Sequence, residues 1–258
     1  MKRLVQLLVL VTPLVMAGGV QAQQQPAGGR GGRGGAPPEP PKNLQILPKD
    51  IPRPELIATM GGFTRGLGVA CSYCHIEPET DGRDDMAADD KAPKKTARVM
   101  MKIMTDLNTR LVAEVGKPAA DLTRVQCVTC HRGVAIPKQL TEILVATDTQ
   151  KGGPAAIAEW RDLRTKYYGS ASYDFSEAGL TGVAQQLVAA NKPDDALAFL
   201  QINLEFFPRS APTYAGMAAA YNRSNDRANA IKSFEKVLEI DPKNANAKRQ
   251  LDQLKAQP

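Results

Sequence analysis

The sequence predicts a mainly α-helical protein built from two dissimilar parts. A short motif, Cys-x-x-Cys-His, occurs at residues 71–75 and again at residues 127–131. A longer repeat, with an offset of 34 residues, occupies the C-terminal third of the chain. Between these features the apolar residues recur at helical spacing. We therefore expect a first part made of helices that are each followed by one motif, and a second part that forms an α-solenoid.

The two motifs together use all four cysteines and both histidines of the chain. Cys-x-x-Cys followed directly by histidine is the attachment sequence of c-type haem. Each thiol can bind one vinyl group of the haem, and the histidine can then ligate the iron. We therefore expect two covalently bound haem c groups. Their attachment and ligand residues are Cys71, Cys74, His75, Cys127, Cys130 and His131.

Other uses of paired cysteines compete with haem attachment. Four thiolates can hold one structural zinc ion, and Cys-x-x-Cys pairs also form disulfides or thioredoxin-like redox centres. None of these uses needs a histidine directly after each pair, whereas haem attachment does. The sequence favours haem on this ground.

The N-terminal residues have the features of an exported protein. A basic start is followed by a mostly apolar run to about Met16 and by small residues that end at Ala22, which is the pattern of a cleavable signal peptide. The apolar run is shorter than the roughly 20 residues that span a bilayer, and no cysteine near Ala22 could carry a lipid. We expect residues 1–22 to be removed and the mature protein to be periplasmic, without a transmembrane segment.

Residues 23–42 contain many glycines and prolines and no large apolar side chain. Such a stretch cannot bury enough surface to offset its ordering entropy. It is expected to be a flexible linker. The haem domain is therefore placed at residues 43–140.

The haem domain contains two stretches with helical periodicity. The first begins near Pro54 and carries four glycines, which would let a flat macrocycle approach the helix backbone. The second runs from Lys95 to about Val115. Between them, residues 77–95 are polar and are expected to form a solvated loop. The apolar residues of the first stretch are Leu56, Ile57, Met60 and Phe63.

Each haem iron needs a sixth ligand or an open coordination site. Because both histidines are already assigned as fifth ligands, methionine is the expected partner, and histidine–methionine ligation is typical of electron-carrying cytochromes c. Met60 is the candidate on the first helix, 11 residues before Cys71. Three methionines share one face of the second helix, so periodicity alone does not choose between Met100, Met101 and Met104.

These segments resemble the haem-binding cytochrome subunit of photosynthetic reaction centres, over roughly residues 42–138. In that family each haem unit is a helix, a turn and a Cys-x-x-Cys-His segment, and a methionine from the helix is the sixth ligand. The resemblance implies that Met60 pairs with His75 and that Met100 pairs with His131, with Met104 as second choice and Met101 as third. The matching residues are Lys42–Leu47, Glu55-Leu56 through Met60, Cys71–His75, Ala97-Arg98-Val99-Met100 with Asn108, and Cys127–Gly133 with Pro137.

The chain also departs from that family. It has two motifs, whereas the family typically has four haems, and residues 111–120 contain no histidine that could serve another haem. The resemblance therefore implies a dihaem, non-lipidated member. It implies the electron-carrying architecture and not a photosynthetic role.

The C-terminal part is expected to begin with a linking helical segment at residues 141–172, packed down by Trp160. Residues 173–258 then repeat at the 34-residue period of tetratricopeptide (TPR) units, since residues 191–196 match residues 225–230. Two copies are fewer than the three usually needed for stability, so we expect the module to dock on the linking segment or on another subunit. A final helix would cap it.

Together these features predict a periplasmic dihaem c-type cytochrome that transfers single electrons and contacts partner proteins through its TPR-like module. The expected partners are redox proteins, in particular a membrane-associated complex, and not nucleic acid. The net charge of +6 is no nucleic-acid signal, because residues 43–140 hold 14 Lys/Arg and 12 Asp/Glu before the haem propionates are counted. No catalytic residues stand out. A peroxidase-like dihaem oxidoreductase with one open iron, and a haem-containing scaffold, are the alternatives.

Overall fold

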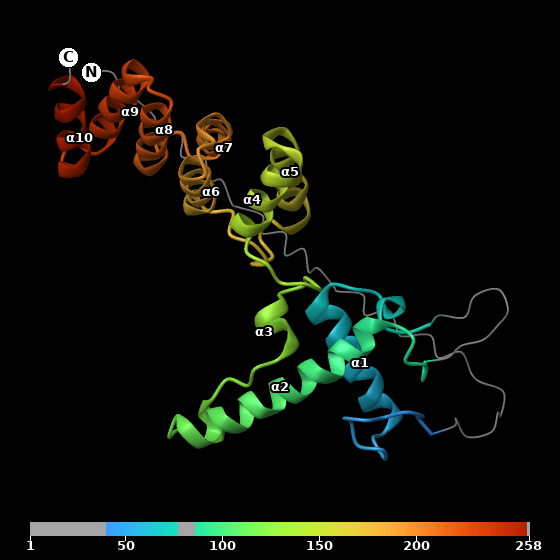
Figure 1. Ribbon diagram of the computed structural model, residues 1–258. Helices are drawn as coiled ribbons and strands as arrows, with labels where there is room; N and C mark the ends of the chain where they lie inside the picture. Colours follow the sequence, from blue (N-terminus) through green and yellow to red (C-terminus); the bar gives the residue numbers. More distant parts are fainter. Residues whose placement is uncertain (1–39, 77–85, 257–258) are drawn as a thin grey trace, which may run out of the picture. The chain divides into compact units, whose positions relative to one another are not determined.

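The computed structural model of the protein describes residues 40–76 and 86–256 (Figure 1). Within these two ranges every regular element is a helix, which confirms the predicted mainly α-helical class. The expected signal peptide, nearly all of the expected linker and part of the polar loop lie outside the described residues. No helix in the described ranges combines the length and the apolar character that crossing a bilayer requires.

Helix α1 (Arg53–Leu67) forms close to where the sequence predicts it. Pro54 lies in its first turn, where a missing N–H costs no hydrogen bond, and Glu55 lies beside the positive end of the helix. Gly68 ends the helix with a φ of 66°, a left-handed conformation that glycine adopts without a steric penalty. The first motif follows at once, as a 3₁₀ turn over Cys71–Tyr73.

Helix α2 (Ala92–Glu114) begins three residues before the predicted Lys95. Pro93 lies in its first turn, and the fixed φ of proline favours helix initiation there. Helix α3 (Cys127–His131) is the second motif itself. Thr129 occupies one of the two variable positions of the motif and caps the N-terminus of this short helix. Its hydroxyl accepts a hydrogen bond from the backbone N–H of Gln126 at 3.0 Å.

The haem domain buries almost no apolar side chains of its own. Every buried hydrophobic residue of the described chain lies at or after Leu140. A segment that buries so little apolar surface cannot offset its own conformational entropy. This part of the chain therefore needs a further apolar surface to complete its core. The large apolar side chains left exposed in α1 and α2 are Ile57, Val99, Met100, Ile103, Leu107 and Val112.

Four helices after the second motif share one hydrophobic core: α4 (Leu140–Lys151), α5 (Gly153–Tyr167), α6 (Glu177–Ala189) and α7 (Pro193–Phe206). The expected linking segment is thus two helices, because Gly152 reverses the chain with a φ of 85°. An ion pair of 2.5 Å ties α4 to the start of α7, between Lys192 and the buried Asp148. The repeat module therefore packs on the linking segment, as expected.

The last three helices continue the repeat that α6 and α7 begin. Helices α8 (Ala211–Arg223) and α9 (Arg227–Ile240) each begin 34 residues after α6 and α7, and α10 (Ala245–Ala256) begins 34 residues after α8. Figure 1 shows these three helices following one another at the red end of the chain. Their buried residues form a second core, so α10 covers the end of the repeat.

Replacing Phe199 with alanine is expected to destabilise the repeat module strongly. The Phe199 side chain is 0% exposed in the core of α4–α7, and such a truncation typically costs about 3–5 kcal/mol. Urea denaturation of the full chain, followed by circular dichroism, measures the loss. The same substitution at Phe206, which is 39% exposed, is the matched control and is expected to cost clearly less. Equal losses at the two positions would contradict the assigned core.

Candidate haem-binding site

The first motif is folded so that its three reactive side chains come from one tight turn. The backbone N–H groups of both Cys74 and His75 donate to the carbonyl of Cys71, at 3.1 and 3.0 Å. The His75 ring is oriented by its Nδ1 atom, which lies 2.9 Å from the carbonyl oxygen of Met86. A carbonyl can only accept, so Nδ1 carries a proton, and in the neutral ring Nε2 then has its lone pair free. This is the form of histidine that ligates a metal.

In the second motif the histidine is oriented in the same way, by a carbonyl that is closer in the sequence. The Nδ1 atom of His131 lies 3.0 Å from the carbonyl oxygen of Val134, three residues further along the chain. By the same argument Nδ1 donates and Nε2 is free. Both histidines therefore present an oriented Nε2, as a fifth ligand to haem iron requires.

All four cysteines are free thiols, with no disulfide between them. Burial raises the pKa of the Cys74 thiol, and the charges of Lys91 and Lys94 oppose that shift. Burial also raises the pKa of Cys127, a backbone hydrogen bond of the same residue opposes that shift, and the Cys130 side chain adds to it. The described residues include every cysteine and histidine, and among them no group of three or more His, Cys, Asp or Glu could hold a metal ion. The zinc alternative therefore has no ligand cluster in the described chain.

The second motif packs directly on the helix of the first unit. The N–H of Gly133 donates to the carbonyl of Gly66 at 3.0 Å, which joins the end of α3 to α1. A Cβ atom on Gly66 would lie 3.1 Å from the Cβ of Cys127, and one on Gly68 would lie 2.0 Å from the carbonyl oxygen of Gly133. These two glycines thus admit the second motif and not a macrocycle, which is where the structure differs from our expectation. Gly62 has no heavy atom within 4 Å of such a Cβ and keeps the expected approach open.

Asn108 fastens α2 to the second motif. Its Nδ2 donates to the carbonyl of Val125 at 2.9 Å, and its Oδ1 accepts the N–H of the same residue at 2.8 Å. Val125 lies two residues before Cys127, so this two-point contact fixes the start of the motif against the helix. Sequence reasoning noted Asn108 only as part of a resemblance. An amide in the apolar stripe of a helix was the signal that could have identified its role.

The candidate sixth ligands differ in their surroundings. Met60 is half-buried on α1. On α2, Met101 and Met104 are half-buried in the same stripe as Asn108, whereas Met100 lies beside that stripe and is 42% exposed. These positions do not test which sulfur ligates, and the pairing of Met100 with His131 stays a prediction.

The residues present fit covalent haem. Two pairs of free thiols are each followed by an imidazole with an oriented Nε2, and thioether attachment with histidine ligation uses these groups. The apolar side chains that α1 and α2 leave exposed supply surface against which a macrocycle can pack. Fold and site together define the class of the c-type cytochromes.

Comparison with known proteins places the chain within that class. The family described as "Photosynthetic reaction centre cytochrome C subunit" matches residues 34–193, which is more than half of the chain. The protein therefore belongs to the photosynthetic reaction centre cytochrome c subunit family. Membership of a cytochrome c family implies covalently bound haem and electron transfer.

Two curated relatives are photosynthetic reaction center cytochrome c subunits. The relative from Thermochromatium tepidum is 32% identical over 99 residues, which are 38% of this chain and 22% of that protein. The relative from Rubrivivax gelatinosus (strain NBRC 100245 / IL144) is 30% identical over 105 residues, covering 37% of this chain and 27% of that protein. The match thus spans about a quarter of the length of these relatives.

A solved structure is similar to part of the chain. The first TPR domain of the human RPAP3 protein matches with a TM-score of 0.33 and 22% sequence identity, over 45% of this chain and 87% of that domain. The helical repeat described above rests on the 34-residue spacing of α6–α10 themselves.

Proposed function

We propose that the protein is a dihaem c-type cytochrome of the periplasm that transfers single electrons. One haem is attached at Cys71 and Cys74, and the second at Cys127 and Cys130. The observation that carries the proposal is that both motif histidines donate their Nδ1–H to a backbone carbonyl and so leave Nε2 for iron. When bound, haem supplies an iron that gains and loses one electron.

The residues of this chain hold and orient the two haems. His75 and His131 act as fifth ligands, and the carbonyls of Met86 and Val134 fix the planes of their rings. Met60 is the proposed sixth ligand of the His75 haem, and Met100 that of the His131 haem. The bond between Gly66 and Gly133 holds the second motif on the helix of the first unit, so both attachment sites belong to one packed group.

The remainder of the chain is assigned to contacts with other proteins. Residues 43–140 form the haem domain in this proposal, residues 141–172 the linking segment and residues 173–258 the TPR-like module. The start of the apolar core at Leu140 supports the first of these limits. Helical repeats of this kind bind peptides or partner proteins. The proposed partners are redox proteins, in particular a membrane-associated complex of the kind named for the relatives.

A haem assay on the purified, exported protein tests the proposal. We expect two haems per chain, as measured by the pyridine haemochrome spectrum against protein concentration, and a redox titration with one electron per haem. A colourless protein that contains zinc would overturn the proposal. Rapid reaction with hydrogen peroxide or binding of carbon monoxide to the reduced protein would instead favour a peroxidase-like oxidoreductase with an open iron.

Replacing Met60 or Met100 with alanine tests the sixth ligands. Each substitution is expected to remove about half of the methionine–iron charge-transfer absorption and to lower one of the two reduction potentials, because one of two irons loses its sulfur ligand. Met101→Ala is the control on the same helix and is expected to leave the band intact. An unchanged spectrum for Met100→Ala would transfer the assignment to Met104.

A further inference from the structure

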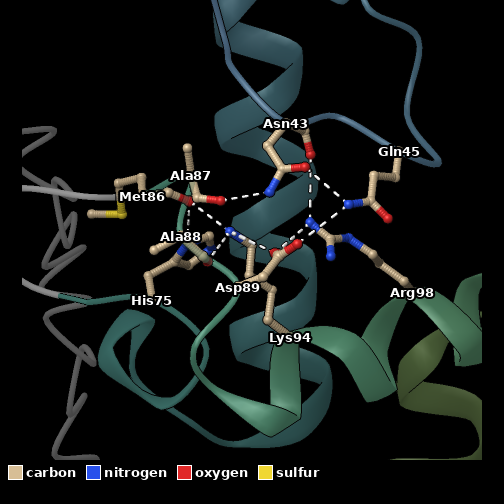
Figure 2. Close-up of polar contacts among 9 residues, drawn as sticks. All are labelled: Asn43, Gln45, His75, Met86, Ala87, Ala88, Asp89, Lys94 and Arg98. Carbon is tan, nitrogen blue, oxygen red and sulfur yellow. Dashed lines mark hydrogen bonds and ion pairs between the residues drawn. The ribbon is translucent and has the colours of Figure 1, made fainter.

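The two histidine–carbonyl bonds differ in what else binds the carbonyl. The oxygen of Met86 accepts a second hydrogen bond, from the ammonium group of Lys94 at 2.9 Å, in addition to the bond from His75 (Figure 2). Among the described residues, His131 is the one side chain that donates to the oxygen of Val134. One histidine therefore shares its acceptor with a cation, and the other does not.

The position of Lys94 is fixed by several contacts. Its Nζ also donates to the carbonyl of Ala88 at 2.6 Å and lies 3.6 Å from a carboxylate oxygen of Asp89. The Lys94 side chain is 13% exposed, so water screens its charge less than that of a surface lysine. Figure 2 shows Lys94 at the start of α2, pointing at the segment that follows the loop after His75.

The carboxylate near Lys94 has a second cationic partner. Arg98 forms an ion pair of 2.7 Å with Asp89, and the hydrogen bonds from Arg98 and Asn43 hold the pKa of this carboxyl well below its usual range. The Asn43 amide also donates to the carbonyl of Ala87 at 2.6 Å, which secures the same segment. Asp89 thus has two cationic partners, and the ammonium group of Lys94 lies beside the carbonyl of Met86 as well.

A cation on that carbonyl changes what the histidine gives to the iron. A ring whose Nδ1–H is bound by a strong acceptor gains imidazolate character and stabilises ferric iron. The ammonium group draws electron density from the oxygen of Met86, so this oxygen becomes a weaker acceptor for His75. The positive charge itself also disfavours the ferric state, which carries one more positive charge than the ferrous state. Both effects raise the reduction potential.

We propose that Lys94 holds the His75 haem at a higher reduction potential than the His131 haem. In the half-reduced protein one electron then passes from the ferrous His131 haem to the ferric His75 haem, with no bond made or broken. Lys94 acts through the Met86 carbonyl and does not touch the haem iron. This inference rests on the proposed attachment of two haems.

A second lysine also lies at the first motif. At the first motif, the charges of both Lys91 and Lys94 reach the thiol of Cys74, and the Lys91 ammonium group also donates to the backbone carbonyl of Ser72.

Redox titration of the Lys94→Gln variant tests the inference. In the wild type we expect two separate one-electron steps. In the variant we expect the upper step to fall by about a tenfold change in its equilibrium constant, which is about 59 mV for one electron, and the lower step to stay in place. Lys94→Arg, which keeps the charge, is expected to retain most of the wild-type separation.

Two matched variants separate charge from structure. Lys95→Gln removes the same charge from the next, exposed position of α2 and is expected to move neither step. Arg98→Gln disturbs the ion pair with Asp89 but leaves the Met86 carbonyl to Lys94, so its shift is expected to be smaller than that of Lys94→Gln.

The outcomes are distinct. A fall of the lower step in Lys94→Gln would reverse the order of the haems, and equal shifts in Lys94→Gln and Lys95→Gln would remove the role of the carbonyl contact. Haem content is measured first on every variant. Fewer than two haems in the wild type would overturn the proposed function, whereas two haems with unmoved potentials would overturn only the role of Lys94.

Discussion

A chain without haem is expected to lose the structure of residues 40–76 and 86–139 while α4–α10 stay folded. The helices of the haem domain bury almost no apolar side chains, and most of the stability of a helix in a protein comes from packing of its apolar face. The cores of α4–α10, by contrast, are made by the polypeptide itself. The chain to measure carries alanine in place of Cys71, Cys74, Cys127 and Cys130. Hydrogen exchange should show α1–α3 unprotected and α5–α9 protected.

The haem-loaded wild type is the control for this experiment. In that protein we expect protection in α1 and α2 as well as in the repeat module, because the macrocycles cover their exposed apolar faces. Slow exchange in α2 of the haem-free chain would contradict the conclusion that haem completes the core. Loss of protection in α6 and α7 would show instead that the repeat module depends on the haem domain.

Gly68→Ala is expected to break the contact between the two haem units. Gly68 has a φ of 66°, and a Cβ there would lie 2.0 Å from the carbonyl oxygen of Gly133. The left-handed conformation alone costs alanine about 1 kcal/mol, and overpacking of this kind adds about 1–3 kcal/mol. We expect a correspondingly lower free energy of unfolding for the haem domain, measured by guanidinium denaturation and followed by haem absorbance. The two reduction potentials are also expected to move, since the second motif loses its support.

Gly116→Ala separates conformational strain from the clash. Gly116 has nearly the same φ, 67°, but no heavy atom lies within 4 Å of the position of its Cβ. This variant is expected to lose only the conformational part, about 1 kcal/mol, with unchanged potentials. If both variants lost the same free energy, the close approach of Gly68 and Gly133 would not be a feature of the protein in solution.

The helix limits show where local patterns were informative. The 34-residue match between segments predicted the helix pairs of the repeat, because each unit carries its own turn residues and apolar spacing. Helix α2 begins three residues before the predicted Lys95, because Pro93 favours a first helical turn at that point. The linking segment consists of two helices, because Gly152 separates α4 from α5 with a φ that glycine tolerates best.

The candidate site shows the same division. Attachment of haem by two thiols and an adjacent histidine needs five consecutive residues in fixed order. Residues 71–75 and 127–131 can therefore be identified from the sequence alone. Only the tertiary structure shows three other features of the site. These are the free Nε2 atoms, the packing of Gly66 on Cys127, and the lysine that shares a carbonyl with His75. Each of these contacts joins residues whose neighbourhood depends on the path of an intervening segment. No local periodicity encodes that path, because it is set by how the helices pack.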